Sequence, residues 1–192
     1  MPEVPHRRDA ARNRGLLLDA ARRIVAERGT EVPLDEIARE AGVSRTTLHR
    51  HFANREDLAL AVLRDNVADI EQRASSLADV PDGAVQLYHY LLDVQLDVPW
   101  LAQMISQGPR EGRSTRATSE LSERTLAALE PLVEAAHREG LLHSSVMAAD
   151  MLLTLPMAMT VLVVDRQAPA GPLIDRVRAI LHRGLFTTEP PQ

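Results

Sequence analysis

Three adjacent polar residues, Arg45, Thr46 and Thr47, follow Ser44 at the start of a short helical segment. Serine is favoured at the residue that caps a helix, so Ser44 is predicted to begin this helix and to place the next three residues on its first turn. An arginine fork binds the edge of a guanine, and threonine binds a base or contacts a thymine methyl group. These residue types at this spacing predict direct reading of base pairs in double-stranded DNA.

A second set of side chains on the same segment suits the DNA backbone. It consists of His49, His51 and Arg55, and Arg50 is expected to be exposed on the same turns. Side chains of this kind bind phosphate oxygens, which position a protein on DNA without identifying its sequence. No acidic residue occurs between positions 45 and 55, so the outward surface of this segment is expected to be polar and basic.

Residues 34–52 have the pattern of a helix-turn-helix, in which two short helices meet across a tight turn. Gly42 is expected to adopt the positive φ that ends the first helix, Val43 to fill the turn, and the small Ala38 to let the helices approach closely. The apolar residues expected to face inward are Leu34, Ile37, Ala41, Leu48 and Phe52. The second helix, residues 45–51, would then enter the major groove.

The rest of the chain also has helical periodicity, and no segment alternates as a strand does, so the fold class is predicted to be all-α with about nine helices. Gly108–Gly112 and the residues around Pro169 are predicted loops. The expected helices cover residues 9–28, 34–41, 45–51, 55–77, 82–98, a short one from 99, 116–138, 146–165 and 171–186. Asn54 is expected to cap the fourth of them.

The charge distribution supports a separate nucleic-acid-binding part. The whole chain of 192 residues has a net charge of −5, which by itself disfavours a nucleic-acid partner. Residues 1–55, however, contain 11 Arg against 8 acidic residues, a net of +3, and residues 56–192 contain 11 Arg against 19, a net of −8. A basic N-terminal part joined to an acidic one is typical of a DNA-binding protein with a second module.

Four stretches of this chain resemble the DNA-binding domain of TetR-family transcriptional regulators: residues 17–29, 37–44, 47–52 and 55–58. The resemblance implies a homodimer with a three-helix DNA-binding domain at residues 1–53. Residues 54–187 would form the ligand-binding and dimerisation domain, and residues 188–192 a tail. It further implies a repressor that binds a palindromic operator and is released when a small apolar or amphipathic ligand shifts the fourth helix. The two recognition helices would have to fit major grooves about 34–36 Å apart.

Three positions depart from the family pattern. His49 stands where the family usually has a tyrosine that contacts phosphate, and its imidazole is shorter and titratable. Arg55 replaces the usual lysine and keeps the ability to bind phosphate. Pro33 replaces a serine or threonine that commonly caps the first helix of the motif, and it is expected to begin that helix instead.

The family resemblance places a ligand pocket in the second domain. The residues that suit its wall are Tyr88, Leu92, Trp100, Met104, Met151 and Leu155. Methionine and aromatic side chains form adaptable apolar cavities, although the same residues would also form an ordinary core. Helix 171–186 has a wide apolar stripe (Leu173, Ile174, Val177, Ile180, Leu181 and Leu185), which favours dimerisation together with helix 146–165.

Other classes of protein have weaker support. Glu134 and His137 have the spacing of half a carboxylate-bridged metal site, but no coherent second half of such a site is evident, so neither a catalytic site, a metal nor a cofactor is expected. A ligand-independent DNA-binding regulator or an activator remains an alternative to a repressor. The chain has no cysteine, which fits the reducing cytoplasm, and neither a signal peptide nor a membrane-spanning segment is expected.

Overall fold

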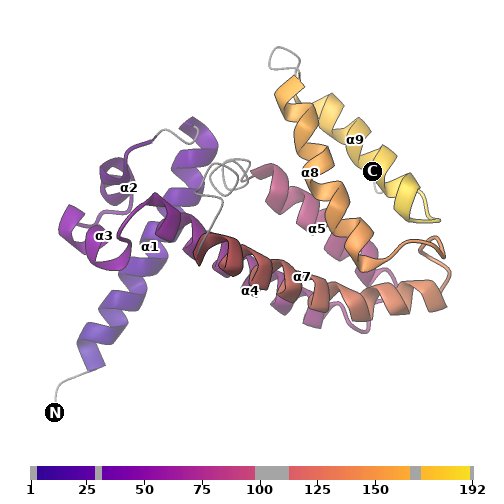
Figure 1. The fold of residues 1–192 in the computed structure, drawn as a ribbon, viewed down its shortest axis with the longest axis horizontal. Coiled ribbons are helices and arrows are strands. Elements are labelled where there is room, and N and C mark those ends of the chain that lie inside the picture. The colour runs from indigo at the N-terminus through magenta and orange to yellow at the C-terminus, as the bar shows by residue number, and fades with distance from the viewer. Residues whose placement is uncertain (1–3, 29–31, 98–112, 165–169, 191–192) are drawn as a thin grey trace. The chain divides into compact units, whose positions relative to one another are not determined.

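The computed structural model describes residues 4–28, 32–97, 113–164 and 170–190. In that part of the chain eight α-helices follow one another, so the all-α prediction is confirmed (Figure 1). They are α1 (Val4–Arg28), α2 (Leu34–Glu40), α3 (Arg45–His51), α4 (Arg55–Ser76), α5 (Gly83–Asp97), α7 (Arg113–Arg138), α8 (Ala148–Val164) and α9 (Ala170–Leu185). The predicted short helix from residue 99 lies outside the described residues.

The chain forms two compact units. The first holds the described residues of Met1–Asp65 and Val98–Ser119, and the second those of Asn66–Asp97 and Glu120–Gln192. Helices α4 and α7 each contribute residues to both units. No helix in the described ranges is long and apolar enough to cross a membrane.

In the first unit, α1, α2 and α3 pack on one another (Figure 1). Leu17 and Ala21 of α1 are fully buried, and Ile24 lies one turn further along the same face. This spacing turns one apolar stripe of α1 toward the two short helices. Arg22 of α1 also binds Asp65, in the middle of α4, at 2.7 Å, which ties α4 to this three-helix group.

In the second unit, residues of α4, α5, α7, α8 and α9 form one hydrophobic core. Its largest fully buried side chains are Tyr88, Leu87, Leu92, Leu129, Met151 and Phe186. Arg124 of α7 binds both carboxylate oxygens of Glu71 on α4, at 2.8 and 2.6 Å. This pair keeps the pKa of Glu71 low, because the carboxylate accepts hydrogen bonds from a cation.

Two prolines lie inside helices of the second unit without ending them. Helix α7 continues through Pro131, and α8 continues through Pro156. Each proline lacks the N–H that would bind the carbonyl four residues earlier. The remaining hydrogen bonds and the apolar packing of these two helices are therefore sufficient to maintain the helix across each proline.

The segment after α9 returns to the end of α7. Phe186 forms an isolated antiparallel bridge with Leu142, in which His143 N donates to Leu185 O and Thr187 N donates to Leu141 O, both at 3.0 Å. Thr187 Oγ1 also donates to the carbonyl of Gly140 at 2.7 Å. Residues 185–187 are thus held to residues 140–143 by hydrogen bonds that helical periodicity does not predict.

Candidate nucleic-acid interface

The turn between α2 and α3 is set by backbone bonds around Gly42. Gly42 has a φ of +67°, and its N–H donates to Arg39 O at 3.1 Å while the N–H of Val43 donates to Ala38 O at 3.0 Å. These two bonds form a Schellman motif, which requires a residue with positive φ after the helix. The predicted role of Gly42 is therefore confirmed.

The predicted cap of α3 is also confirmed. Ser44 Oγ accepts a hydrogen bond from Thr47 N at 3.1 Å, and Asn54 Oδ1 caps α4 in the same way by accepting from Asp57 N at 2.8 Å. Both side chains satisfy N–H groups that have no partner within the first turn of a helix. The beginning of α3 and the beginning of α4 are therefore each set by a local signal in the sequence.

Pro33 differs from the expectation, because it precedes α2 rather than beginning it. Its backbone is extended, with ψ of 143°, and it occupies the capping position without a side-chain hydrogen bond. Its carbonyl accepts from Glu36 N at 3.0 Å and from Ile37 N at 3.4 Å. The hydroxyl that serine or threonine would add at this position is absent, so this chain has no side-chain phosphate donor there.

The apolar side of the motif is buried as predicted. Leu48 and Phe52 of the second half are almost completely inaccessible. Ile37 and Ala38 of α2, and Ala41 directly after it, are also buried. Leu34 is half-buried at the start of α2. Arg14 of α1 lies over the ring of Phe52, 5.8 Å from its centre, and adds a cation–π contact to this packing.

The opposite side of α3 is exposed. Arg45, Thr46, His49 and Arg50 are all exposed residues, so four of the seven predicted DNA contacts lie on one open surface. Thr47 is half-buried, and its hydroxyl lies 2.8 Å from Ser44 Oγ. Thr47 therefore contributes to the cap of α3, and its methyl group is the part left for contact with a base.

Arg55 and His51 lie in more enclosed surroundings than the sequence indicates. Arg55 Nη2 donates to the carbonyl of Val32, which links the start of α4 to the segment before α2. His51 is half-buried, and its Nε2 is buried with no hydrogen-bond partner in the described part of the chain. Burial, then Arg50 and Arg14, lower the pKa of His51, which favours a neutral ring that attracts phosphate weakly.

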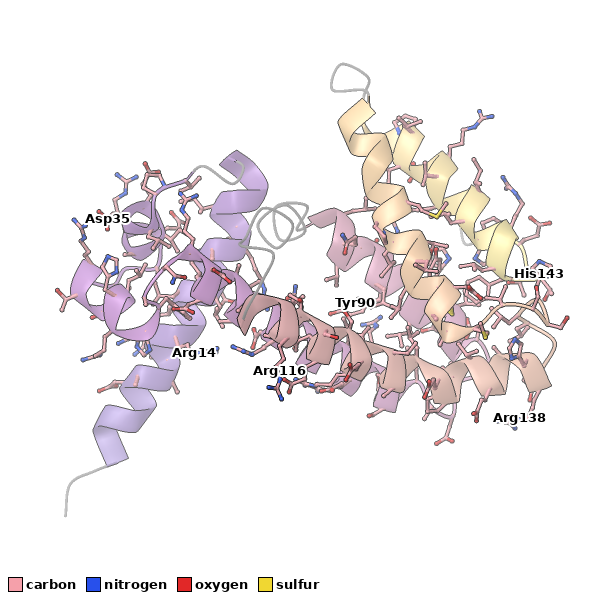
Figure 2. All side chains as sticks on the ribbon, in the orientation of Figure 1. Arg14, Asp35, Tyr90, Arg116, Arg138 and His143 are labelled. Atoms are coloured by element: carbon pink, nitrogen blue, oxygen red, sulfur yellow. The ribbon has the colours of Figure 1, made fainter. Side chains whose placement is uncertain are left out.

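Asp35 is a residue of this surface that the sequence analysis missed. It lies in the first turn of α2, where Figure 2 labels it. Its Oδ1 is 3.1 Å from Nε of Arg45 on α3. No signal in the sequence indicates this pair, because ten positions separate the residues and the turn at Gly42 brings them together. The acidic side chain beside α3 comes from the neighbouring helix, outside the acid-free stretch 45–55.

The Val32 contact predicts that Arg55→Ala acts mainly on stability. Removing the guanidinium leaves the carbonyl of the buried Val32 without its charged donor, and we expect the free energy of unfolding to fall by about 1–2 kcal/mol. Urea denaturation followed by circular dichroism measures this change. Arg64→Ala, at an exposed position of the same helix, is the matched control and should change stability little. Unchanged stability, with equally weakened binding to all DNA duplexes, would instead support a phosphate contact.

The predicted pocket residues of the second unit are close-packed where the structure describes them. Tyr88, Leu92 and Met151 are fully buried, Leu155 is half-buried, and Trp100 and Met104 lie outside the described residues. The hydroxyl of Tyr88 lies 2.6 Å from Oγ1 of Thr154, which satisfies it within the core. A cavity beside Leu92 measures about 10 Å³, room for a single water molecule, and is lined by Leu92, Leu96, Ala158, Ile174, Val177 and Arg178.

Several large apolar side chains of the second unit are exposed. Leu153 and Met157 lie one turn apart on α8 and expose 63% and 60% of their surface. Ile180 on α9 exposes 53%, and α9 packs directly on α8. Val177 and Leu181 of the predicted stripe on α9 pack against the core of their own chain. The stripe is therefore divided between the core and the surface.

The predicted half metal site is open to solvent. Glu134 and His137 are both exposed on α7, and His137 Nε2 lies 3.3 Å from the carbonyl of His143. Among the described residues, no group of three or more His, Asp or Glu is arranged to hold a metal ion.

Comparison with known proteins identifies the first unit. Residues 17–62 match the family model for bacterial regulatory proteins of the tetR family. This stretch contains α2, α3, the second half of α1 and the beginning of α4. It therefore includes every residue of the exposed surface described above.

Two regulators have sequences related to part of this chain. The transcriptional repressor LfrR of Mycolicibacterium smegmatis is 38% identical over 88 residues, which are 45% of this chain and 46% of LfrR. The transcriptional regulator BetI of Rhizobium meliloti is 38% identical over 78 residues, or 38% of this chain and 36% of BetI. The matched part thus spans less than half the length of these relatives.

Two solved structures resemble the chain over almost all of its length. A TetR transcription regulatory protein from Mycobacterium vanbaalenii superposes with a TM-score of 0.68 and 27% identity, covering 95% of this chain and 100% of its own. A TetR transcriptional regulator from Streptomyces coelicolor superposes with a TM-score of 0.66 and 25% identity, covering 93% and 99%. The first unit thus matches the tetR family of bacterial regulatory proteins in sequence, and the chain has the all-α fold of these two TetR regulators.

Proposed function

We propose that this chain is a sequence-specific DNA-binding repressor that inserts α3 into the major groove of a palindromic operator as a homodimer. The observation that carries the proposal is the exposed surface of α3, which presents Arg45, Thr46, His49 and Arg50 while Leu48 and Phe52 anchor the helix in the first unit. A helix-turn-helix reads bases with the N-terminal residues of its second helix, which is where Arg45 and Thr46 lie.

The proposed DNA contacts are of two kinds, contacts to bases and contacts to phosphates. Arg45 and Thr46 are the base-reading residues, and the methyl group of Thr47 adds an apolar contact of the kind that recognises thymine. His49 and Arg50 bind phosphates, and the residues nearest the core, His51 and Arg55, support the helix more than they contact DNA. Residues 1–53 form the DNA-binding domain in this proposal, and residues 54–187 form the ligand-binding and dimerisation domain.

Replacing Arg45, Thr46 and Thr47 together by alanine tests the base-reading role. A preferred DNA duplex is first selected with the parent protein from a random-sequence pool. A scrambled duplex of the same base composition serves for comparison. We expect the triple variant to lose on the order of tenfold to a hundredfold in affinity for the selected duplex, because a good base contact contributes about 1–3 kcal/mol. Fluorescence anisotropy at fixed salt measures both affinities.

The control for this experiment is Arg64→Ala, which removes an arginine from an exposed position of α4 and should preserve the preference for the selected duplex. In cells, the parent should lower expression of a reporter gene that carries the selected duplex in its promoter, and the triple variant should not. A parent that recovers no preferred duplex, or a triple variant with unchanged preference, contradicts the proposal. Raised reporter expression would indicate an activator.

A small ligand is proposed to release the DNA. LfrR, which is 38% identical to this chain over 88 residues, is described as a repressor. A transcriptional regulator from Saccharomonospora viridis, which shares the fold at 19% identity, is described in complex with choline. The apolar core around Tyr88 and Met151, which the second unit builds from several helices, would have to open to admit a small apolar or amphipathic molecule.

Dimerisation is proposed to occur through α8 and α9. Leu153, Met157 and Ile180 are large apolar side chains that remain exposed on these two helices. Exposed apolar residues gathered in this way favour association with another apolar surface. A second copy of the chain offers the same residues, and a twofold symmetric interface of this kind suits a palindromic operator.

A further inference from the structure

Arg45 is held by a neighbouring carboxylate before any DNA is bound. Its Nε lies 3.1 Å from Oδ1 of Asp35, and the two side chains expose 72% and 49% of their surface. An ion pair this exposed contributes little to the stability of a fold, about 0–1 kcal/mol. Its position on the outward side of the helix-turn-helix gives it another consequence, because this surface is the one proposed to meet DNA.

The atoms in the pair restrict how Arg45 can bind a base. The Asp35 carboxylate binds Nε, at the side of the guanidinium. The two terminal nitrogens, Nη1 and Nη2, remain available for two parallel end-on hydrogen bonds to a base. An arginine recognises guanine by two parallel hydrogen bonds, and recognition depends on the orientation of the fork. Asp35 therefore orients the side chain as well as compensating its charge.

We propose that Asp35 is a positioning residue that increases sequence discrimination by holding Arg45 for end-on contact with guanine. The inference rests on the proposed DNA-binding function. On a matching duplex Arg45 binds guanine while its Nε stays with Asp35, and the carboxylate remains neutralised. On other sequences Arg45 would turn toward a phosphate, which leaves the Asp35 carboxylate uncompensated beside a polyanion. Non-specific binding is therefore disfavoured more than specific binding.

Asp35→Asn removes the charge and keeps the size of the side chain. With the selected and scrambled duplexes described above, we expect the ratio of the two affinities to fall on the order of tenfold, chiefly because the scrambled duplex binds more tightly. Anisotropy titrations at fixed salt measure the ratio. Thermal unfolding of the free protein should change little, since the pair is exposed.

Glu36→Gln is the matched control. It removes the same charge from the same turn of α2, where Glu36 pairs with Arg39 at 3.7 Å and not with Arg45. A general effect of charge or of the helix dipole would lower the ratio equally in both variants, and that result would overturn the proposal. A large drop in thermal stability of Asp35→Asn alone would also overturn it, because it would make the role structural.

The Arg45→Ala background separates this inference from the proposed function. If Asp35 acts through Arg45, then Asp35→Asn in that background should raise affinity for both duplexes alike and leave their ratio unchanged. A ratio that still falls would mean that Asp35 acts by itself, against the inference. Failure of the parent to select any duplex would instead contradict DNA recognition as a whole.

Discussion

Met157→Glu is expected to separate the proposed dimer into monomers and to lower affinity for a palindromic duplex by about 10²- to 10⁴-fold. Met157 exposes 60% of its surface on α8, one turn after Leu153, which exposes 63%. A carboxylate at the centre of an apolar interface would be buried without a partner, which costs several kcal/mol. The monomer retains an intact helix-turn-helix, because the substitution lies in the second unit.

The loss of DNA affinity follows from the linkage of two binding domains. When one domain of a dimer is bound, the other meets its half-site at a high effective concentration, and separate monomers lose this advantage. Analytical ultracentrifugation measures the oligomeric state, and anisotropy measures binding to duplexes with one and with two half-sites. We expect the variant to bind the single half-site as the parent does.

Met147→Glu is the matched control for this substitution. Met147 is another methionine, exposed to 62%, but it precedes α8 and does not belong to the Leu153–Met157 surface. It should leave both the oligomeric state and the DNA affinity unchanged. A Met157→Glu protein that sediments like the parent would show that the proposed dimer uses another surface.

The second large effect is expected from acidification, through two histidines in contact inside the second unit. His89 Nε2 of α5 lies 3.0 Å from His182 Nδ1 of α9, and the rings stack with centroids 5.2 Å apart. His182 is completely buried, and its Nε2 lies 3.0 Å from the carbonyl of Thr188. A carbonyl only accepts, so His182 Nε2 donates to it. In a neutral His182 ring Nδ1 then accepts, and His89 Nε2 is its donor. Burial lowers the pKa of both rings, which favours their neutral forms.

Protonation of either ring opposes this arrangement. The pKa of His89 falls from 6.5 to about 4, because of burial, then His182 and Arg178, against an opposing effect of Asp93. The pKa of His182 is also lowered, first by burial and further by Arg183, while the backbone of Thr188 and the Glu189 carboxylate oppose the shift. A proton on Nδ1 of His182 would place two donors against each other.

The sign of the stability change follows from proton uptake. Between pH 6.5 and about 4 the unfolded chain binds protons that folded His89 does not, so the free energy of unfolding decreases as the pH falls through this interval. Above pH 6.5 the contribution of the neutral His89 ring to the free energy of unfolding is fully present. A pKa shift of this size corresponds to at most about 3 kcal/mol in the free energy of unfolding. Because His89 is partly exposed, we expect the free energy of unfolding to fall by about 1–3 kcal/mol.

His89→Gln tests this pH dependence, because the amide can still donate to His182 Nδ1 but does not titrate. Urea denaturation across the interval from pH 6.5 to 4, at constant protein concentration, should give a smaller loss of stability for this variant than for the parent. His137→Gln, at an exposed position of α7, should retain the slope of the parent. Equal slopes for His89→Gln and the parent would exclude the pair as the source of acid sensitivity.

Signals within a few residues were enough to predict most helix boundaries. Gly42 and Gly140 end α2 and α7 with positive φ, and Ser44 and Asn54 cap the helices that follow them. The predicted helices 45–51, 55–77 and 171–186 differ from the observed ones by at most one residue at either end. A cap or a left-handed glycine acts on the backbone beside it, so its effect can be read without knowledge of the fold.

The surroundings of individual side chains were predicted less well. Arg55 is an exposed cation by residue type, yet it donates to a carbonyl 23 positions earlier, and His51 is half-buried on a helix expected to present it to phosphate. Pro33 was expected to begin α2 and lies at the capping position before it. The predictions for Trp100 and Met104 remain predictions, because both residues lie outside the described part of the chain.

By itself, the sequence determined the helix-turn-helix, its capping residues and the exposed face of Arg45, Thr46, His49 and Arg50. These features depend on helical periodicity and on interactions across one turn of backbone. Only the tertiary structure decided that Asp35 holds Arg45, that Arg55 binds the Val32 carbonyl, and that His89 meets His182 from 93 positions away. Such pairs form because packing brings distant helices together, and the identity of two residues carries no information about the distance between them.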